Sequence, residues 1–222
     1  MTAGHVAAGI RESGKVGIVL AVSPQRDTPR ALPVAEFEDL PCDIGLLRVP
    51  SAAKLPPDWI YTLRWRRTPI VQFDDVRTLG FPHGSHTLGK RTNVIQRAFR
   101  GYIVCDPPEF ELPAFGGQRF GLYEVSFPAP LGLSGAPLLF GTGQFLPRIA
   151  VSGVIIGNSQ YKMFVPGSGE TISENGETTI VERYESLSLG IAVPVQDILP
   201  LRSELVASTI GEYLEAQDLL YS

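Results

Sequence analysis

The residues with the clearest chemical potential lie in one glycine-rich stretch, Pro130–Leu139 (PLGLSGAPLL). Ser134 stands there between Leu133 and Gly135, and Gly132 lies two residues before it. Glycine adopts backbone angles that other residues avoid, so a tight Gly-x-Ser-Gly turn can aim the serine hydroxyl outward. The same turn can direct the backbone N–H groups of Gly132 and Ser134 toward one point, as stabilisation of an oxyanion requires. Because glycine–serine turns are common in β proteins, the hypothesis depends on finding a base and an acid elsewhere.

A hydrolytic serine needs a general base within hydrogen-bond reach and a carboxylate that orients the base. The chain has three histidines, His5, His83 and His86. His5 follows Thr-Ala-Gly at the expected end of a strand. Asp43 begins the apolar run Asp43–Leu47 (DIGLL), where an unpaired carboxylate would be costly to bury. We therefore expect Asp43 to orient an imidazole. The spacing of His83 and His86 could suggest a metal, but a loop is the simpler interpretation because no cysteine or carboxylate cluster accompanies them.

Three short motifs resemble those of trypsin-like serine peptidases, which have the chymotrypsin fold. Thr2–His5 (TAGH) is similar to the Thr-Ala-Ala/Gly-His motif of that family, and Asp43–Leu47 resembles its Asp-Ile-Ala-Leu-Leu motif. Gly132–Pro137 (GLSGAP) is similar to Gly-Asp-Ser-Gly-Gly-Pro. The order His, Asp, Ser is also the family's, with spacings of 38 residues from His5 to Asp43 and 91 from Asp43 to Ser134.

The resemblance implies a role for each of these residues. Ser134 would attack a scissile carbonyl, His5 would shuttle the proton, and Asp43 would hold His5 in place. Gly132 and Ser134 would supply the oxyanion hole. No metal or organic cofactor is implied. The segment Gly153–Asn158 resembles the substrate-lining strand of the family. The residues expected to line the substrate pocket are Pro128, Ile156, Gly157 and Asn158.

Two departures from the family pattern concern activation and disulfides. Leu133 stands where secreted zymogens have an aspartate that pairs with a newly cleaved N-terminus, so activation of that kind is not expected. Val6 replaces the cysteine that follows the histidine in secreted animal members. Both departures favour a bacterial-type relative without that disulfide.

Strand and turn patterns predict the fold that must position these groups. Glycine and proline number 23 and 19 and are spread along the chain, which indicates many turns between short strands. Roughly ten short apolar runs bounded by turn residues favour an all-β barrel architecture. A linker near Ser51–Pro69 would divide two barrels, and Pro166–Glu177 is expected to be an exposed loop.

Helix is predicted only near the end, over Val195–Leu199 and Glu204–Leu219. One apolar stripe runs along the longer segment, and core packing is the favoured explanation, with a partner surface as the alternative. The members of the stripe are Val206, Ile210, Tyr213 and Leu214.

The resemblance makes the fold expectation more specific. It implies two six-stranded antiparallel Greek-key β-barrels and a C-terminal α-helix. The expected division is a partial first barrel over residues 1–60 with His5 and Asp43, a second barrel over 61–195 with Ser134, and a terminal helix over 196–222. About three strands precede the histidine in this fold and only four residues do here, so the first barrel is expected to be N-terminally truncated.

The composition limits which binding partners and which cellular compartment we expect. The net charge of −4 provides no electrostatic footprint for nucleic acid. No apolar run approaches the roughly 18 residues that a membrane span requires, and there is no signal-peptide pattern at the start. The two cysteines, Cys42 and Cys105, do not form a disulfide framework, which favours a reducing, cytoplasmic compartment.

The sequence therefore predicts a serine endopeptidase that acts on a polypeptide through an acyl-enzyme. The first alternative is a catalytically inactive module of the same fold that binds peptides or a partner protein. A third interpretation is an esterase-like hydrolase.

Overall fold

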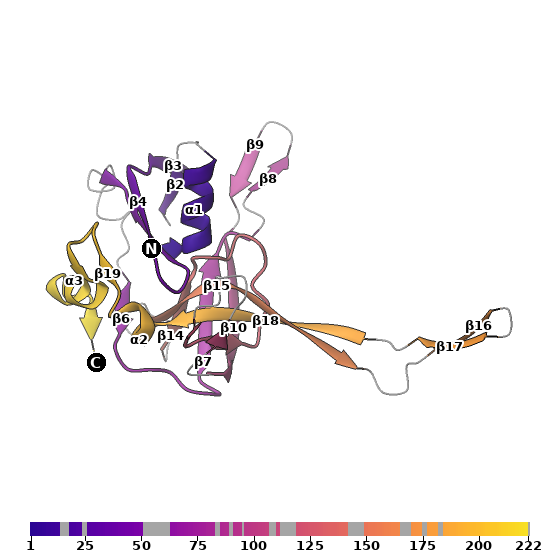
Figure 1. Cartoon of the computed structure of the whole chain (residues 1–222). Helices are drawn as coiled ribbons and strands as arrows, with labels where there is room; N and C mark the ends of the chain where they lie inside the picture. Colours follow the sequence, from indigo (N-terminus) through magenta and orange to yellow (C-terminus); the bar gives the residue numbers. More distant parts are fainter. Residues whose placement is uncertain are drawn as a thin grey trace.

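Figure 1 shows the computed structural model of the chain, whose described part consists mostly of β-strands with three short helices. The structure describes residues 1–13, 18–23, 26–50, 63–82, 85–88, 91–94, 96–106, 110–111, 119–141, 149–164, 170–174, 177–181 and 184–221. His83, most of the expected linker and the expected domain boundary at residue 60 lie outside these ranges.

Six antiparallel strands close into a barrel. In their order of pairing they are β14 (Pro137–Phe140), β7 (Asp75–Gly80), β10 (Arg97–Cys105), β13 (Tyr123–Val125), β18 (Tyr184–Pro194) and β15 (Ala150–Phe164). The barrel closes because β14 pairs with β7 on one side and with β15 on the other. The predicted β-barrel architecture is confirmed for this part of the chain.

Alternation along the strands builds the barrel core. In β7, Val76, Thr78 and Gly80 are buried, and they alternate with residues that are exposed or half-buried. Successive side chains of a strand point to opposite faces of the sheet, so this pattern places one face inside the barrel. The buried cluster inside comprises Ile70, Val76, Ile103, Tyr123, Val125, Phe127, Ala129, Leu133, Ala136, Leu138, Ile155 and Ala192.

Two short strands extend the barrel sheet beyond β15. β6 (Arg64–Arg66) runs parallel to β15, and β21 (Leu220–Tyr221) runs parallel to β6. The backbone N–H of Trp65 donates to the Leu219 carbonyl at 2.7 Å, just before β21 begins. The end of the chain is thereby attached to the barrel.

The N-terminal part forms a small separate sheet of three strands. β1 (Thr2–Ala3) and β4 (Glu36–Leu40) pair with opposite edges of β5 (Ile44–Arg48). Helix α1 (Gly4–Glu12) follows β1 directly, although helix was predicted only near the end of the chain. That expectation was wrong because the helix lacks a side-chain N-cap and contains two glycines, which weaken its sequence signal.

The remaining described strands form two-stranded sheets. The pairs are β2 (Ile18–Ser23) with β3 (Arg26–Pro33), β8 (Ser85–Leu88) with β9 (Arg91–Val94), β11 (Phe110–Glu111) with β12 (Arg119–Phe120), β16 (Glu170–Glu174) with β17 (Glu177–Val181), and β19 (Arg202–Ser203) with β20 (Ser208–Thr209). The β16–β17 pair corrects the expected loop over Pro166–Glu177. It lies beyond the outer end of the long β15–β18 hairpin, which projects from the barrel (Figure 1).

A second apolar cluster joins the small sheet to the outside of the barrel and to the C-terminal segment. It comprises Ala3, Leu40, Ile44, Phe120, Leu122, Val154, Ile156, Ile191, Val193, Ile198, Ile210 and Leu214. The C-terminal segment contributes through α2 (Val195–Ile198) and α3 (Ile210–Ala216). Core packing therefore accounts for Ile210 and Leu214 in the predicted stripe, while Tyr213 is 41% exposed.

The helix expected over Glu204–Leu219 is shorter than predicted. Ala207 has a left-handed backbone with φ of 56°, which interrupts any helix at that point. Thr209 then caps α3, because its hydroxyl accepts from the Glu212 N–H while the Glu212 carboxylate accepts from the Thr209 N–H. This capping box fixes the start of the helix at Ile210.

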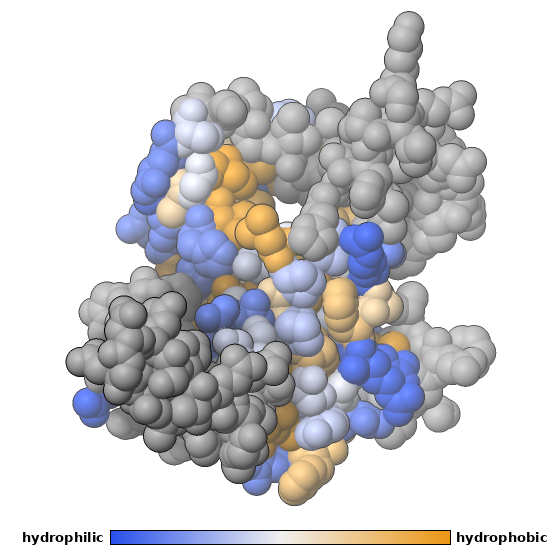
Figure 2. Space-filling model, turned by 90° about the vertical axis from the view of Figure 1, so that its right-hand side faces the viewer, coloured by the Kyte–Doolittle hydropathy of each residue, from blue (hydrophilic) through white to orange (hydrophobic). Residues whose placement is uncertain are grey.

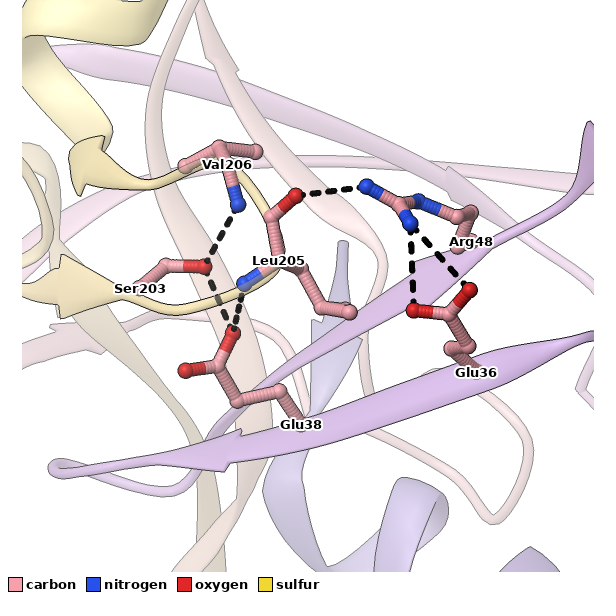
Figure 3. A network of polar contacts seen from close by, with 6 residues as sticks. All are labelled: Glu36, Glu38, Arg48, Ser203, Leu205 and Val206. Atoms are coloured by element: carbon pink, nitrogen blue, oxygen red, sulfur yellow. Dashed lines mark hydrogen bonds and ion pairs between the residues drawn. The ribbon is translucent and has the colours of Figure 1, made fainter.

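Polar contacts attach the C-terminal segment to the small sheet (Figure 3). Glu38 on β4 accepts hydrogen bonds from the Ser203 hydroxyl at 2.5 Å and from the Leu205 N–H at 3.2 Å. Arg48 on β5 donates to both carboxylate oxygens of Glu36 at 3.1 Å and to the Leu205 carbonyl at 2.8 Å. The sheet is thus held from the side opposite α1.

The surface is mixed in character. On the face shown in Figure 2, hydrophilic residues lie toward both margins and hydrophobic residues gather between them. Within the described ranges, no helix is both long enough and apolar enough to cross a bilayer.

Candidate active site

His5 and Asp43 form the best-defined polar pair of the N-terminal sheet. The His5 Nδ1 lies 2.7 Å from the Asp43 Oδ2, and the His5 backbone N–H donates to the Asp43 Oδ1 at 2.6 Å. The carboxylate therefore holds both the ring and the backbone of the histidine. The Asp43 side chain is only 5% exposed, whereas that of His5 is 45% exposed, so the far side of the imidazole is open.

The backbone around Asp43 is arranged for this contact. Cys42 and Asp43 have φ angles of 63° and 57°, in the left-handed region that aspartate tolerates better than most residues. Gly4 donates its N–H to the Asp43 carbonyl at 2.7 Å. A Cβ on Gly4 would lie 2.9 Å from the Asp43 Oδ1 and 3.1 Å from its carbonyl carbon. The glycine before the histidine is thus required by close backbone approach.

The surroundings of His5 raise its pKa. The hydrogen bond to Asp43 raises the pKa of His5 above its ordinary value of 6.5, and this effect outweighs burial, which lowers it. With Nδ1 donating to Asp43, the neutral ring carries its lone pair on Nε2. That is the tautomer in which a histidine can accept a proton from a serine.

Ser134 lies in a tight loop between β13 and β14. Gly132 and Gly135 have φ angles of 94° and 87°, so both glycines of the motif are required by the backbone. The loop closes through bonds from Leu133 N–H to the Pro130 carbonyl (2.9 Å) and from the N–H of Ala136 to the Leu133 carbonyl (3.0 Å).

Leu133 anchors the loop through packing. Its side chain is 0% exposed and belongs to the barrel core. A Cβ on Gly80 would lie 2.5 Å from the Leu133 Cδ1, so the leucine occupies the space that this glycine leaves. Burial of the leucine fixes the loop without an ion pair at this position.

Two backbone donors beside Ser134 are unoccupied. Within the described residues, the N–H groups of Gly132 and Ser134 donate no hydrogen bond to the protein. The neighbouring Gly135 N–H, in contrast, donates to the Ile155 carbonyl at 2.7 Å. The loop therefore leaves available the two donors expected to form an oxyanion hole.

The loop of Ser134 and the strand before His5 touch at their backbones. A Cβ on Gly135 would lie 2.9 Å from both the Ala3 nitrogen and the Thr2 Cα. Ala3 is two residues before His5, and Gly135 is one residue after Ser134. In the part of the chain that the structure describes, the Ser134 hydroxyl makes no hydrogen bond, so none joins it to His5. Such contacts often tighten only in the complex with substrate.

The expected pocket residues differ in exposure and in contacts. Pro128 is exposed, whereas the Ile156 side chain is 2% exposed and packs in the core, so only its backbone can face a ligand. A Cβ on Gly157 would meet nothing within 4 Å. Asn158 bonds through its side chain to both backbone groups of Ala129, at 2.6 and 2.7 Å. Sequence reasoning missed Ala129, because that contact joins residues 29 positions apart.

The described hollows do not coincide with these residues. A pocket of about 530 Å³ lies between β5, β6 and α3, with Leu46, Trp65 and Tyr213 in its wall. Neither it nor the other described pockets are lined by His5 or Ser134. The described pockets therefore do not mark a substrate site beside Ser134 or His5.

One thiol, that of Cys42, lies beside Asp43 in the sequence. Both cysteines are unpaired. Across the described ranges, no three side chains of the His, Cys, Asp and Glu types lie close enough together to hold a metal ion. Burial raises the pKa of the Cys42 thiol to about 11, with the Asp197 charge as a second cause, so Cys42 is a poor nucleophile beside Asp43.

Comparison of the chain with models of known protein families found no match. Comparison with curated protein sequences likewise found no similar protein.

Proposed function

We propose that this chain is a serine endopeptidase of the trypsin-like type, with Ser134 as nucleophile, His5 as general base and Asp43 as the group that orients His5. The observation that carries the proposal is the seating of the Ser134 loop on the strand that leads into His5, while Asp43 holds that histidine through two hydrogen bonds. These contacts support the proposal because acyl transfer by a serine needs a histidine base that a carboxylate orients.

The geometry supports a two-stage reaction. Ser134 Oγ attacks the peptide carbonyl carbon while His5 Nε2 takes its proton, and the carbonyl oxygen becomes an oxyanion that the N–H groups of Gly132 and Ser134 receive. The C–N bond then breaks, and His5 returns the proton to the leaving amine. Water attacks the resulting ester with His5 again as base, which releases the acid and restores Ser134. Each oxyanion donor contributes about 2.7–4 kcal/mol in comparable enzymes.

The strand order supports the finer expectation for the fold. If the six barrel strands are taken in chain order, the first three are neighbours and the fourth, β14, returns beside the first, β7. A fourth strand that returns beside the first is the defining feature of a Greek key. In the proposed fold, β1, β4 and β5 belong to the other barrel of the pair. The division into residues 1–60, 61–195 and 196–222 remains a prediction, as do a polypeptide substrate and a cytoplasmic location.

The second candidate function is a catalytically inactive module of the same fold that binds a peptide. It is favoured by one observation, the missing hydrogen bond between Ser134 and His5 among the described residues. In such a module, the loop and the strand would serve only as a docking surface.

A fluorophosphonate probe, which forms a covalent bond with an activated serine, separates the two candidates. We expect labelling of the folded chain, its loss in Ser134→Ala, and its loss in His5→Ala. Ser126→Ala is the matched control, because Ser126 lies in the same barrel and its hydroxyl accepts the Tyr102 N–H at 3.0 Å. A folded chain that the probe does not label would leave the binding module as the better interpretation.

A further inference from the structure

One of the described pockets lies where β13 and α2 begin and shares no residue with the candidate active site. Its volume of about 290 Å³ is below the roughly 300–1,000 Å³ of sites that bind whole drug-sized molecules, so it suits a single side chain. Ile70 and Leu122 contribute apolar wall, whereas Asp106 and Asp197 contribute carboxyl groups. We call this hollow the acidic pocket.

The hydroxyl of Tyr123 is a buried polar group of the acidic pocket. It accepts the Ile70 N–H at 3.2 Å and exchanges hydrogen bonds with the Gln196 amide at 3.1 and 3.3 Å. Burial raises the pKa of this hydroxyl, and the charges of Asp106 and Asp197 raise it further, although the hydrogen bonds partly offset both effects. Both carboxylates therefore lie near the same hydroxyl.

The two carboxylates of the acidic pocket have no positive partner in the described part of the chain. No lysine, arginine or histidine of that part lines the pocket, and none forms an ion pair with Asp106 or Asp197. Burial raises the pKa of Asp197 above its ordinary value, and a hydrogen bond from the Gly121 N–H lowers it by less. A half-buried carboxylate without a counter-ion favours the binding of a cation.

Two exposed apolar side chains accompany the pocket. Val71 lines it and is 58% exposed, and Phe73, two residues further along, is 81% exposed. The Val71 N–H donates to the Asp74 Oδ2 at 2.9 Å, and the Phe73 N–H donates to the Ile103 carbonyl at 2.9 Å, so the turn is held in place. Neighbouring apolar side chains that a fixed turn exposes to water are typical of a surface that contacts a partner.

We propose that the acidic pocket binds an arginine side chain from an exposed basic segment of a partner protein, with the guanidinium between Asp106 and Asp197 and a neighbouring apolar side chain against Phe73. Arginine fits better than lysine, because its planar group carries several N–H donors and the pocket offers several oxygen acceptors. The apolar wall suits the methylene stem of such a side chain. The net charge of −4 also favours approach of a basic partner.

Fluorescence anisotropy with a fluorescein-labelled Ser-Leu-Arg-Leu-Ser amide tests this proposal. The full chain has Ser134→Ala in every arm, so that the peptide is not cleaved. A peptide with citrulline in place of arginine keeps the shape without the charge, and we expect it to bind about tenfold or more weakly. Asp197→Asn should weaken binding of the arginine peptide by a similar factor and leave the citrulline peptide nearly unchanged, as a double-mutant cycle requires of a direct contact.

Further variants separate the pocket from the general charge of the chain. Asp39→Asn is the matched control, because it removes the same charge from a residue that pairs with Arg11 and does not line the pocket. Phe73→Ala should weaken the arginine peptide about fivefold or more, as loss of an exposed aromatic contact does at interfaces. If Asp197→Asn fails to fold, Asp106→Asn changes an exposed residue of the same pocket and answers the same question.

The outcomes are distinct. Equal affinities for the arginine and citrulline peptides, or equal losses in Asp197→Asn and Asp39→Asn, would overturn the arginine site. Agmatine has the arginine side chain without a peptide, and displacement of the labelled peptide by agmatine with equal affinity would overturn a partner segment as the occupant. The fluorophosphonate probe on Ser134 tests the proposed function separately, so failure of one proposal leaves the other intact.

Discussion

Replacing Asp43 by asparagine perturbs the candidate site with almost no change of shape. The two Asp43 carboxylate oxygens accept from the His5 backbone N–H at 2.6 Å and bond the His5 Nδ1 at 2.7 Å. An asparagine can accept at one of these positions only, because its other terminal atom is a donor. If the amide oxygen keeps the backbone bond, the imidazole turns to the tautomer with its proton on Nε2. His5 then cannot take the Ser134 proton.

The expected losses follow from this exchange. In enzymes with a Ser-His-Asp triad, the same substitution lowers kcat about 10⁴-fold. This is a rise in the barrier of about 5.4 kcal/mol, at about 1.36 kcal/mol for each factor of ten. The loss of folding stability should be smaller, about 1–3 kcal/mol, for one buried group left without its partner. The 5% exposure of the Asp43 side chain keeps water from replacing that partner.

The pH dependence provides a second readout. The Asp43 hydrogen bond raises the pKa of His5 above 6.5, and the base must be neutral to act, so wild-type kcat/KM should fall as pH drops through that raised pKa. Without the carboxylate, the acidic limb should move to lower pH. Because the folded pKa is raised, the pair stabilises the fold fully below the unfolded pKa and loses this contribution as pH rises through the folded pKa. That part of the pH dependence should vanish in Asp43→Asn.

The assay is hydrolysis of chromogenic peptide amides between about pH 5 and about pH 9, together with an NMR titration of the His5 ring. Asp39→Asn is the matched control, because Asp39 pairs at 2.6 Å with Arg11 in the last turn of α1, whereas His5 lies in the first turn. An Asp43→Asn chain that keeps its activity within tenfold of wild type, with an unmoved His5 pKa, would refute the reasoning.

Three further predictions concern the glycines and the C-terminal attachment. Gly4→Ala should lower probe labelling at least about tenfold, because its Cβ would press on Asp43, whereas Gly9→Ala, which meets nothing within 4 Å, should stabilise α1 by about 0.5–1 kcal/mol in thermal melts. Gly135→Ala should abolish labelling with the barrel still folded by circular dichroism, since it combines a φ of 87° with a backbone clash; labelling at wild-type rate would contradict the seating of the loop. Burial raises the pKa of Glu38, but hydrogen bonds from Ser203 and two backbone N–H groups outweigh this effect and lower the pKa below 4.5. The contribution of Glu38 to folding stability should therefore be present above pH 4.5 and be lost as pH falls through the pKa of the folded state. Glu38→Ala should remove this acid-side dependence in urea titrations and cost about 2 kcal/mol, and an unchanged acid limb would contradict the assignment.

The sequence predicted the parts of the site that are local. The motif glycines around Ser134 have the positive φ angles that their spacing suggested, and the strand after Asp43 begins at Ile44. What could not be predicted is the contact of Gly135 with Thr2, because it depends on docking between distant segments. The hydrogen bonds between Asn158 and Ala129 could not be predicted for the same reason.

The C-terminal helix shows the opposite case, in which a local signal was present but outweighed. The apolar stripe favoured one long helix, but Thr209 and Glu212 already form the Thr-x-x-Glu pattern of a capping box. Ala207 has a left-handed conformation that ends the preceding turn, and an alanine in the sequence does not predict such a conformation. Periodicity reported which residues would be buried, but capping decided where the helix starts.

Because Gly135 contacts Thr2 and Ala3, the activity of the candidate site should depend on the docking of β1 against the barrel. Its groups are divided between two bodies that can open locally at different free energies. Undocking of β1 and α1 from the barrel would separate base from nucleophile long before the barrel strands come apart. On heating, we therefore expect catalytic activity to be lost in a first transition of small amplitude, which amide exchange would detect as faster exchange in α1. The strands β7 and β10 should unfold in a second transition at higher temperature.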